Sequence, residues 1–549
     1  MINNKSIKNN IDRIFDRYTK PGSPGCALAV VKDEEVIYKQ GYGLANIELH
    51  VPNQPSTVFN IGSMAKQFTA FTIALLESEG KLSLDDDIHN YLPEMHDFGI
   101  PITIQHLIHH SSGLRNTFPE LLALAEWRDT DTTTTADVIW LLEAQRELNF
   151  IPGDEYQYSN SNYILLAKIC ERVSGQSFAD FCQTRLFDPL GMNRSFINDS
   201  IFKLIPGRAL GYYDGENGVW FNAPLNDSVV GPTNVYTTVE DLLNWDENFY
   251  TGKVGGMQVV ERMQRVGHLN DGTSLDYAFG LQVGPAHQHR DWQIVEHGGS
   301  QGGYSSWMMR FPELHFSVVV LFNHFLWDMR EYALRVADLF LEDKDLTKSA
   351  MVEEVSQNEA PQIVRLSEEQ YQEKAGIYFN FQRAALREIE FVKGKLQYQG
   401  LNLLPQSENT FCFEVEPGTQ VRFDRSDEGT ISGMMTLTPS GDYGYSRVKG
   451  FSPSREALNQ FQGRFYSSEL DIYWKIEVGE AGLIAKRRKY VDSILTPVFE
   501  DGFGDDWTPI MGYPRKFLVV FKRDQDRQIV GLNVSGDEVR NLQFYKLCD

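Results

Sequence analysis

Two residues near the start of an apolar stretch have the types and spacing needed to activate a hydroxyl group. Ser63 and Lys66 lie three residues apart in "FNIGSMAKQFTAFTIALLESEG", so a helix places them on one face. Burial and the positive potential at a helix N-terminus both lower the pKa of a lysine from about 10.4. A neutral amine beside a hydroxyl is a base beside a nucleophile. The alternative is a capping serine and a lysine that extends to solvent.

A second motif offers two polar side chains that complete such a pair. Tyr158 and Asn160 lie in "YQYSNSNY", in a loop directly before a predicted helix. The Tyr158 phenol can exchange a proton with Ser63, and the Asn160 amide can hold Lys66. Taken alone, this stretch is also typical of a plain turn.

A third motif, His297-Gly298-Gly299-Ser300, lies at the edge of a predicted late strand. Glycines in a strand let another backbone or a ligand lie close. We expect this strand to line the site, with a donor from His297 to the substrate and a backbone N–H for an oxyanion hole. The alternative is a glycine-rich hairpin with an incidental histidine.

The surrounding sequence predicts the elements that position these motifs. "GCALAVVKDEEVIYKQGYG" predicts two strands joined by a charged turn, and the Ser63 stretch predicts a helix of about 17 residues ending at Gly80. Residues 161–175 predict a helix with a glycine stop, and "GGYSSWMMRFPELHFSVVVLFNH" predicts two adjacent core strands before an amphipathic helix. Because both ends of this region supply strands, we expect an α+β fold with helices on a mostly antiparallel sheet.

The three motifs in this order resemble the penicillin-recognising serine hydrolases, on the branch with class C β-lactamases, D,D-peptidases, D-aminopeptidases and esterases. The resemblance covers about residues 8–340 and extends to the phrases "LIHHSSGL", "LFDPLGM" and "NVYTTVEDLLNW". It implies a β-lactamase/transpeptidase-like catalytic domain over residues 1–345, with an antiparallel sheet flanked by helices.

The resemblance also implies a role for each motif residue. Ser63 is the acylated nucleophile, Lys66 and Tyr158 share general-base and general-acid duty, and Asn160 positions Lys66. His297, Gly298 and Gly299 contact the substrate, and the backbone N–H groups of Ser63 and Ser300 form the oxyanion hole. Water then hydrolyses the acyl-enzyme, and no metal or organic cofactor is required.

One departure from part of the family bears on the substrate. Penicillin-type enzymes often have lysine in the third motif, whereas this chain has His297. A neutral imidazole binds a carboxylate less strongly than a fixed charge does. We therefore expect a small molecule or short peptide without a carboxylate beside the scissile bond, and most of all a D-aminopeptidase or related amidase. D,D-carboxypeptidase, β-lactamase-like and esterase activities remain alternatives.

The C-terminal part of the sequence repeats itself after a polar linker at 346–364. "EKAGIYFN" resembles "QFQGRFYS", and "VRFDRSDEGTISGMMT" resembles "LVVFKRDQDRQIVGLNV". Short alternating strands predict two antiparallel, lipocalin-like barrels at 365–450 and 451–549. A catalytic domain followed by two such barrels resembles the three-domain D-aminopeptidases.

The second repeat contains an insertion that we interpret as an acidic loop at 499–516. In the D-aminopeptidases that the chain resembles, a loop of the last domain reaches toward the active site. Asp501, Asp505 and Asp506 are expected to attract a substrate ammonium there, with Trp507 as a wall of the pocket. A solvated acidic hairpin is the alternative.

Composition narrows the possible partners and the compartment. With 51 Lys and Arg against 75 Asp and Glu, the formal charge of −24 disfavours nucleic acid and anionic membranes as partners. Five scattered cysteines do not form a disulfide framework, and no apolar run is long enough to span a membrane, so we expect a cytoplasmic protein. A homodimer is compatible with the sequence.

Three competing interpretations remain. Residues 298–302 match the Gly-x-Ser-x-Gly nucleophile elbow, but a strand is predicted where the elbow needs a helix. His106, His109 and His110 have a spacing that can hold zinc, although the glutamate of the usual helical motif is missing. A binding protein with hollow barrels and an inactive hydrolase domain is the non-enzyme alternative.

Overall fold

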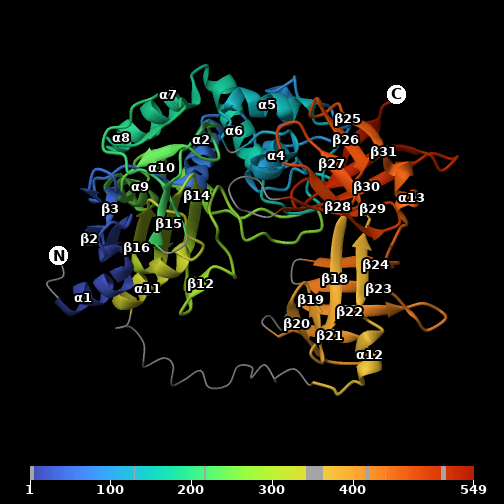
Figure 1. Ribbon diagram of the computed structural model, residues 1–549. Helices are drawn as coiled ribbons and strands as arrows, with labels where there is room; N and C mark the ends of the chain where they lie inside the picture. Colours follow the sequence, from blue (N-terminus) through green and yellow to red (C-terminus); the bar gives the residue numbers. More distant parts are fainter. Residues whose placement is uncertain are drawn as a thin grey trace. The chain divides into compact units, whose positions relative to one another are not determined.

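The computed structural model describes residues 5–128, 130–215, 218–341, 363–381, 383–414, 419–438, 441–507 and 515–548 (Figure 1). The chain divides into two compact units. The first comprises Met1–Phe118, Thr130–Gln145 and Phe150–Lys344, and the second comprises Pro119–Asp129, Arg146–Asn149 and Asp345–Asp549. The second unit therefore includes two short segments from the N-terminal half of the sequence.

The first unit is built on a five-stranded antiparallel sheet with the order β14-β15-β16-β1-β2. The strands are β1 (Cys26–Lys32), β2 (Glu35–Tyr42), β14 (Val295–Gln301), β15 (Tyr304–Phe311) and β16 (Phe316–Phe322). All seven residues of β16 are buried, as expected for a central strand with helices on its faces. The predicted sheet, with strands from both ends of the region, is confirmed.

Helices cover this sheet and surround the motifs. Helices α1 (Lys5–Ile14) and α11 (Met329–Leu341) bury their apolar residues against it, and α9 (Val239–Thr251) packs on β1 and β16. Helix α6 (Asn160–Ser174) ends at Gly175, whose φ of +71° is the left-handed conformation that favours glycine. It packs on the central helix α2 (Lys66–Ser78), in which every side chain from Lys66 to Leu76 is buried.

The smaller elements of the first unit complete its shell. They are β3 (Leu44–Asn46), β4 (Val51–Pro52), β5 (Phe59–Asn60), α3 (Ile104–Ile108), β6 (Thr133–Thr134), α5 (Thr135–Ala144), α7 (Phe178–Cys182), α8 (Asp188–Leu190), β7 (Phe196–Ile197), β8 (Tyr212–Asp214), β9 (Trp220–Asn222), β10 (Asp227–Ser228), β11 (Val235–Thr237), α10 (Gly256–Met263), β12 (Gln288–His289) and β13 (Trp292–Gln293).

The second unit contains two closed antiparallel barrels of eight strands each, which confirms the predicted barrels. The first consists of β17 (Gly376–Asn380), β18 (Ala385–Val392), β19 (Lys395–Tyr398), β20 (Leu401–Pro405), β21 (Thr410–Phe413), β22 (Gln420–Arg425), β23 (Ile431–Thr438) and β24 (Gly441–Val448). The second consists of β25 (Gly463–Ser467), β26 (Ile472–Val478), β27 (Leu483–Lys486), β28 (Ser493–Phe499), β29 (Gly502–Trp507), β30 (Arg515–Arg523), β31 (Ile529–Ser535) and β32 (Leu542–Lys546). Pairing of the first strand with the last leaves neither barrel with an open edge.

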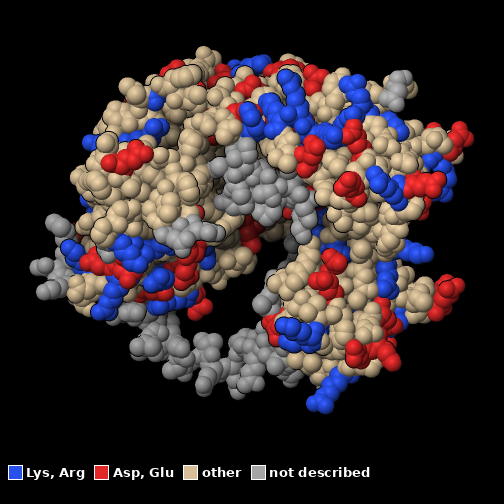
Figure 2. Space-filling model, in the orientation of Figure 1, with Lys and Arg blue, Asp and Glu red and all other residues tan. Residues whose placement is uncertain are grey.

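Short helices flank the barrels, and the predicted linker lies almost entirely outside the described residues. Helix α12 (Glu368–Gln372) precedes the first barrel, α13 (Arg455–Leu458) precedes the second, and α4 (Leu122–Leu124) lies in the 119–129 segment. On the face shown in Figure 2, acidic and basic side chains are interspersed on both units. Among the described residues, no helix has the length and apolar character to cross a membrane.

Candidate active site

Ser63 lies in a tight turn rather than in the long helix that the sequence predicts. Residues 62–65 form a 3-10 turn, and α2 begins only at Lys66. The turn starts at Gly62, whose φ of +51° is left-handed. The backbone N–H of Gly62 donates to Asn60 Oδ1 at 2.7 Å, and the Ser306 hydroxyl donates to the carbonyl of Ile61 at 2.7 Å. These bonds fix the backbone before Ser63 from two sides.

Lys66 is fully buried, and its amine contacts three oxygen atoms. Nζ donates to Asn160 Oδ1 at 2.7 Å and to the carbonyl of Pro232 at 3.3 Å, and it lies 3.1 Å from Ser63 Oγ. Burial lowers the pKa of Lys66 well below its usual 10.5. A neutral amine has two hydrogens and one lone pair. Two acceptors use the hydrogens, so the lone pair is available to accept the Ser63 hydroxyl hydrogen.

Asn160 is held in place at the first turn of α6. Its backbone N–H donates to Asn116 Oδ1 at 2.8 Å, and its Nδ2 donates to the carbonyl of Phe118 at 3.2 Å. The next residue, Ser161, donates to the carbonyl of Arg115 at 2.6 Å. The Asn116 side chain therefore satisfies the first N–H of α6, where the N-cap residue Ser159 makes no side-chain hydrogen bond. Sequence reasoning missed Asn116, although it lies just after the quoted phrase "LIHHSSGL".

Tyr158 faces the same amine from an aromatic wall. Lys66 Nζ lies 4.7 Å from the centroid of the Tyr158 ring, and the centroids of the Tyr158 and His110 rings are 4.4 Å apart. The backbone N–H of Ser159 donates to His110 Nδ1 at 3.2 Å. Burial and the neighbouring Lys66 lower the pKa of His110 well below 6.5. His110 is thus a neutral support for the Tyr158 loop.

His297 lies in the site, but both of its ring nitrogens are hydrogen-bonded within the protein. Nδ1 lies 2.6 Å from the carbonyl of Gly298, which can only accept, so Nδ1 carries the hydrogen. Nε2 then accepts from the Tyr277 hydroxyl at 3.1 Å. Burial, with Lys66 nearby, lowers the pKa of His297 to about 4. His297 is therefore a neutral group whose one ring N–H is already used, which revises the expected donor to substrate.

The two glycines of the third motif bring an edge strand against the nucleophile turn. A Cβ on Gly299 would lie 2.1 Å from the carbonyl oxygen of Ile61 and 2.5 Å from the Ser63 nitrogen. A Cβ on Gly62 would lie 2.5 Å from the Ser300 nitrogen. The backbone nitrogens of Ser63 and Ser300 thus lie close together, and β14 is the sheet edge on this side. This arrangement suits an oxyanion hole.

A buried polar network joins the two backbones that carry these N–H groups. Asn60 Nδ2 donates to Asn234 Oδ1 at 3.2 Å, and Asn234 Nδ2 donates to Asp227 Oδ1 at 2.6 Å. Gln301, the residue after Ser300, donates to both oxygens of Asp227 at 3.0 and 2.8 Å. Burial raises the pKa of Asp227. No sequence motif marks this network, which links the Gly62 turn to the end of β14.

Two of the acidic residues predicted to bind a substrate amine form ion pairs within the second barrel. Asp505 is fully buried and forms an ion pair with Arg487, and Asp501 accepts from Arg523 at 2.6 and 2.8 Å. Both belong to an extended β28–β29 hairpin and not to a loop over 499–516, which corrects that boundary. The side chains of Asp506 and Trp507, and residues 508–514, lie outside the described residues.

Two competing interpretations can be compared with the geometry. Ser300 lies within β14 and is followed by β15, so the strand-to-helix elbow is absent there. The three histidines have separate protein partners: the Thr103 N–H for His106, the carbonyl of Tyr277 for His109 and the Ser159 N–H for His110. No group of three potential metal-binding side chains occurs in the described parts of the chain.

Comparisons with known proteins agree with this fold. A family model described as Beta-lactamase matches residues 11–341. The D-aminopeptidase of Gluconobacter oxydans (strain 621H) is 32% identical over 308 residues, which are 55% of this chain and 56% of that protein. The D-aminopeptidase of Brucella anthropi is 25% identical over 536 residues, or 95% of each chain. The alignment thus spans little more than half of the Gluconobacter protein but nearly all of the Brucella protein.

Solved structures show the same architecture. A penicillin-binding protein homologue from Pyrococcus abyssi, described as octameric, matches 99% of this chain and 100% of its own with a TM-score of 0.54 and 21% identity. The D-amino acid amidase from Ochrobactrum anthropi SV3 matches 62% of this chain and 100% of its own, with a TM-score of 0.52 and 22% identity. With the family model matching more than half of its length, the chain belongs to the β-lactamase family of serine hydrolases.

Proposed function

We propose that this protein forms an acyl-enzyme at Ser63 and hydrolyses an amide bond next to a free amino group, as a D-aminopeptidase or related amidase. The observation that carries the proposal is the fully buried Lys66 amine, 3.1 Å from Ser63 Oγ, with both of its hydrogens used elsewhere. The D-aminopeptidase of Brucella anthropi, which matches 95% of both chains, supports the choice of substrate class.

The proposed reaction has two steps. Ser63 Oγ attacks the substrate carbonyl while its proton passes to the neutral Lys66 amine, with the Tyr158 phenol beside it. The N–H groups of Ser63 and Ser300 stabilise the oxyanion that forms. The leaving amine takes the proton, and the C–N bond breaks. Water then attacks the ester by the same proton route in reverse, which releases the acid and restores Ser63.

The electrostatics of the third motif favour this substrate class over a C-terminal carboxylate. His297 lacks a positive charge at neutral pH because burial lowers its pKa to about 4. Its ring nitrogens already bond to Gly298 and Tyr277. A substrate carboxylate beside the scissile bond therefore gains no charge-assisted hydrogen bond from His297. A substrate without this carboxylate, such as an amino-acid amide, does not depend on such a bond.

The test combines covalent labelling with a substrate panel. A fluorophosphonate is expected to add once to the protein, as measured by intact-mass spectrometry, and Ser63→Ala is expected to abolish the adduct. An adduct that survives in Ser63→Ala contradicts the assignment. D-alanyl-p-nitroanilide, a D-Ala-D-Ala peptide, nitrocefin and p-nitrophenyl butyrate are then compared by kcat/KM. Preference for the anilide supports the proposal, and fast turnover of nitrocefin or the peptide contradicts it.

A further inference from the structure

Two buried carboxylates in the 119–129 segment bind backbone N–H groups of the second barrel, within the second unit. Glu120 is 5% exposed and accepts from the backbone N–H groups of Asp537 and Glu538 at 3.2 and 2.8 Å. Both donors lie in the turn between β31 and β32. A Cβ on Gly536 in this turn would lie 2.7 Å from Glu120 Oε2, so a larger residue there would have to displace this carboxylate.

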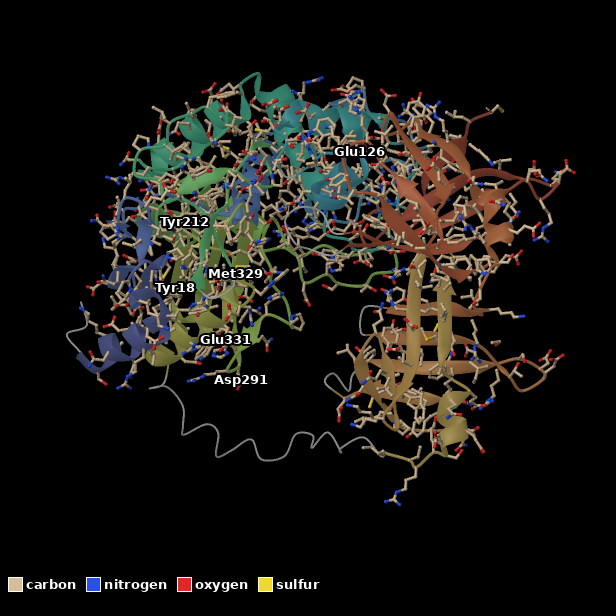
Figure 3. The ribbon with its side chains drawn as sticks, viewed as in Figure 1. Tyr18, Glu126, Tyr212, Asp291, Met329 and Glu331 are labelled. Atoms are coloured by element: carbon tan, nitrogen blue, oxygen red, sulfur yellow. The ribbon has the colours of Figure 1, made fainter. Side chains whose placement is uncertain are left out.

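Glu126, labelled in Figure 3, makes the same kind of contact with a second turn. It is 4% exposed and accepts from the backbone N–H groups of Arg488 and Lys489 at 3.1 and 3.2 Å. These donors lie between β27 and β28, at the same end of the up-and-down barrel as the β31–β32 turn. The Tyr490 hydroxyl donates to the carbonyl of Trp127 at 2.7 Å. Glu126 also has a left-handed φ of +60°, which a non-glycine residue keeps only where its surroundings impose it.

The 146–149 segment is held by the same barrel end. Asn149 Nδ2 donates to the carbonyl of Glu538 at 2.8 Å, and its Oδ1 accepts from the backbone N–H of Arg540 at 2.9 Å. The Arg540 guanidinium donates to the carbonyl of Asn149 at 3.2 Å. The side-chain amide of Asn149 therefore pairs one donor and one acceptor with the backbone of the β31–β32 turn.

These contacts make the position of the 119–128 segment depend on the barrel. A buried carboxylate is costly unless donors compensate it, and here the four backbone donors belong to two barrel turns. The segment begins at Pro119, whose nitrogen shares one planar peptide group with the Phe118 carbonyl. That carbonyl accepts from Asn160 Nδ2 at 3.2 Å, while Oδ1 of the same amide accepts from Lys66 at 2.7 Å.

We propose that the second barrel is a positioning element for the active site. Its β27–β28 turn holds Glu126 and its β31–β32 turn holds Glu120. Through these two residues the 119–128 segment fixes the Phe118 carbonyl. This carbonyl orients the Asn160 amide so that the amide oxygen accepts from Lys66. Glu120 and Glu126 are positioning residues and do not touch substrate. The catalytic consequence rests on the roles of Asn160 and Lys66 in the proposed function.

The test uses full-length Glu120→Gln, Glu126→Gln and the double variant. Glutamine keeps the size of the side chain but replaces one acceptor oxygen by a donor, which faces a backbone N–H. Glu480→Gln is the matched control, because Glu480 is exposed in the β26–β27 turn at the other end of the barrel. We measure the rate of fluorophosphonate addition against pH by intact mass, and hydrogen exchange of peptides covering 115–128 and 158–164.

We expect the double variant to add the probe about 10- to 100-fold more slowly, the cost of misplacing a catalytic group by about 1 Å. Its pH midpoint shifts, and exchange is faster in both peptides. Glu480→Gln behaves as wild type. The proposal is overturned if hydrogen exchange in residues 115–128 of the double variant is unchanged. It is also overturned if hydrogen exchange there is faster but the rate and the pH midpoint of probe addition are unchanged. If wild type itself adds no probe, the proposed function fails, and exchange over 158–164 still decides whether the barrel positions Asn160.

Discussion

Replacing Gly299 by alanine separates the two halves of the proposed oxyanion hole. The new Cβ meets the Ile61 oxygen at 2.1 Å and the Ser63 nitrogen at 2.5 Å, and these backbone atoms cannot rotate away. Carbon atoms of this kind stay at least about 3.0 Å from such neighbours, so β14 and the turn must move apart by roughly 0.9 Å. An oxyanion bond of about 2.9 Å then becomes about 3.8 Å, which is no longer a hydrogen bond.

The expected cost is that of losing one oxyanion donor, about 10²- to 10³-fold in kcat. Overpacking adds about 1–3 kcal/mol of destabilisation, which thermal unfolding measures separately. Gly444→Ala is the control, because a Cβ on this strand glycine of the first barrel meets only Met435 Sδ at 3.8 Å. Stopped-flow assay of the anilide substrate measures kcat. A folded Gly299→Ala protein with kcat within threefold of wild type refutes the reasoning.

Three further predictions follow from the buried groups. Lys66→Met is expected to slow probe addition to Ser63 by about 10²- to 10⁴-fold, because the neutral amine is the base. In wild type the addition rate should rise with pH through a midpoint well below 10.5. A midpoint near 10.5 contradicts a buried neutral amine. The pKa values of His109 and His297 are lowered to about 4, so the unfolded chain binds more protons than the folded chain below pH 6.5. Each of the two histidines therefore lowers the free energy of unfolding by about 3 kcal/mol as the pH falls from 6.5 to 4. Calorimetry that shows constant stability over this range argues against both lowered pKa values. Asp227→Asn places an amide against the Asn234 and Gln301 donors. We therefore expect the free energy of unfolding, measured by chemical denaturation, to fall by about 1–3 kcal/mol and kcat to fall with it. Wild-type values of both quantities would show that the network is dispensable.

Local patterns were sufficient to predict the elements that carry the motifs. The apolar run of β16 and the glycine after α6 each specify structure through neighbouring residues alone. The 3-10 turn before Lys66 was not predicted, because it depends on Gly62 lying against Ser300 in the folded sheet. Tyr277, which bonds His297, belongs to no motif and is recognised only once β14 is placed.

The contacts of the second unit had even less local signal. Glu120 and Glu126 bond to backbone N–H groups more than 360 residues later in the chain, and backbone donors leave no trace in side-chain identity. Asp505 belongs to an acidic cluster in the sequence, yet strand alternation turns it into the barrel, where it meets Arg487. Acidity alone therefore could not distinguish a substrate loop from a buried ion pair.

The buried amine of Lys66 predicts how a charged substrate changes the pH dependence of the reaction. Within the described parts of the chain, burial is the cause that lowers its pKa, and no carboxylate opposes it. A substrate carboxylate near Nζ stabilises the ammonium form and removes the base, whereas a substrate ammonium stabilises the neutral form. The pH profile of kcat reports the pKa of Lys66 in the complex with substrate, and that of kcat/KM reports its pKa in the free enzyme. With an amino amide as substrate, we therefore expect the midpoint of the kcat profile to lie below that of the kcat/KM profile. An ester without an amine should leave the two midpoints equal, and a midpoint that rises with the amino amide would contradict this account of the site.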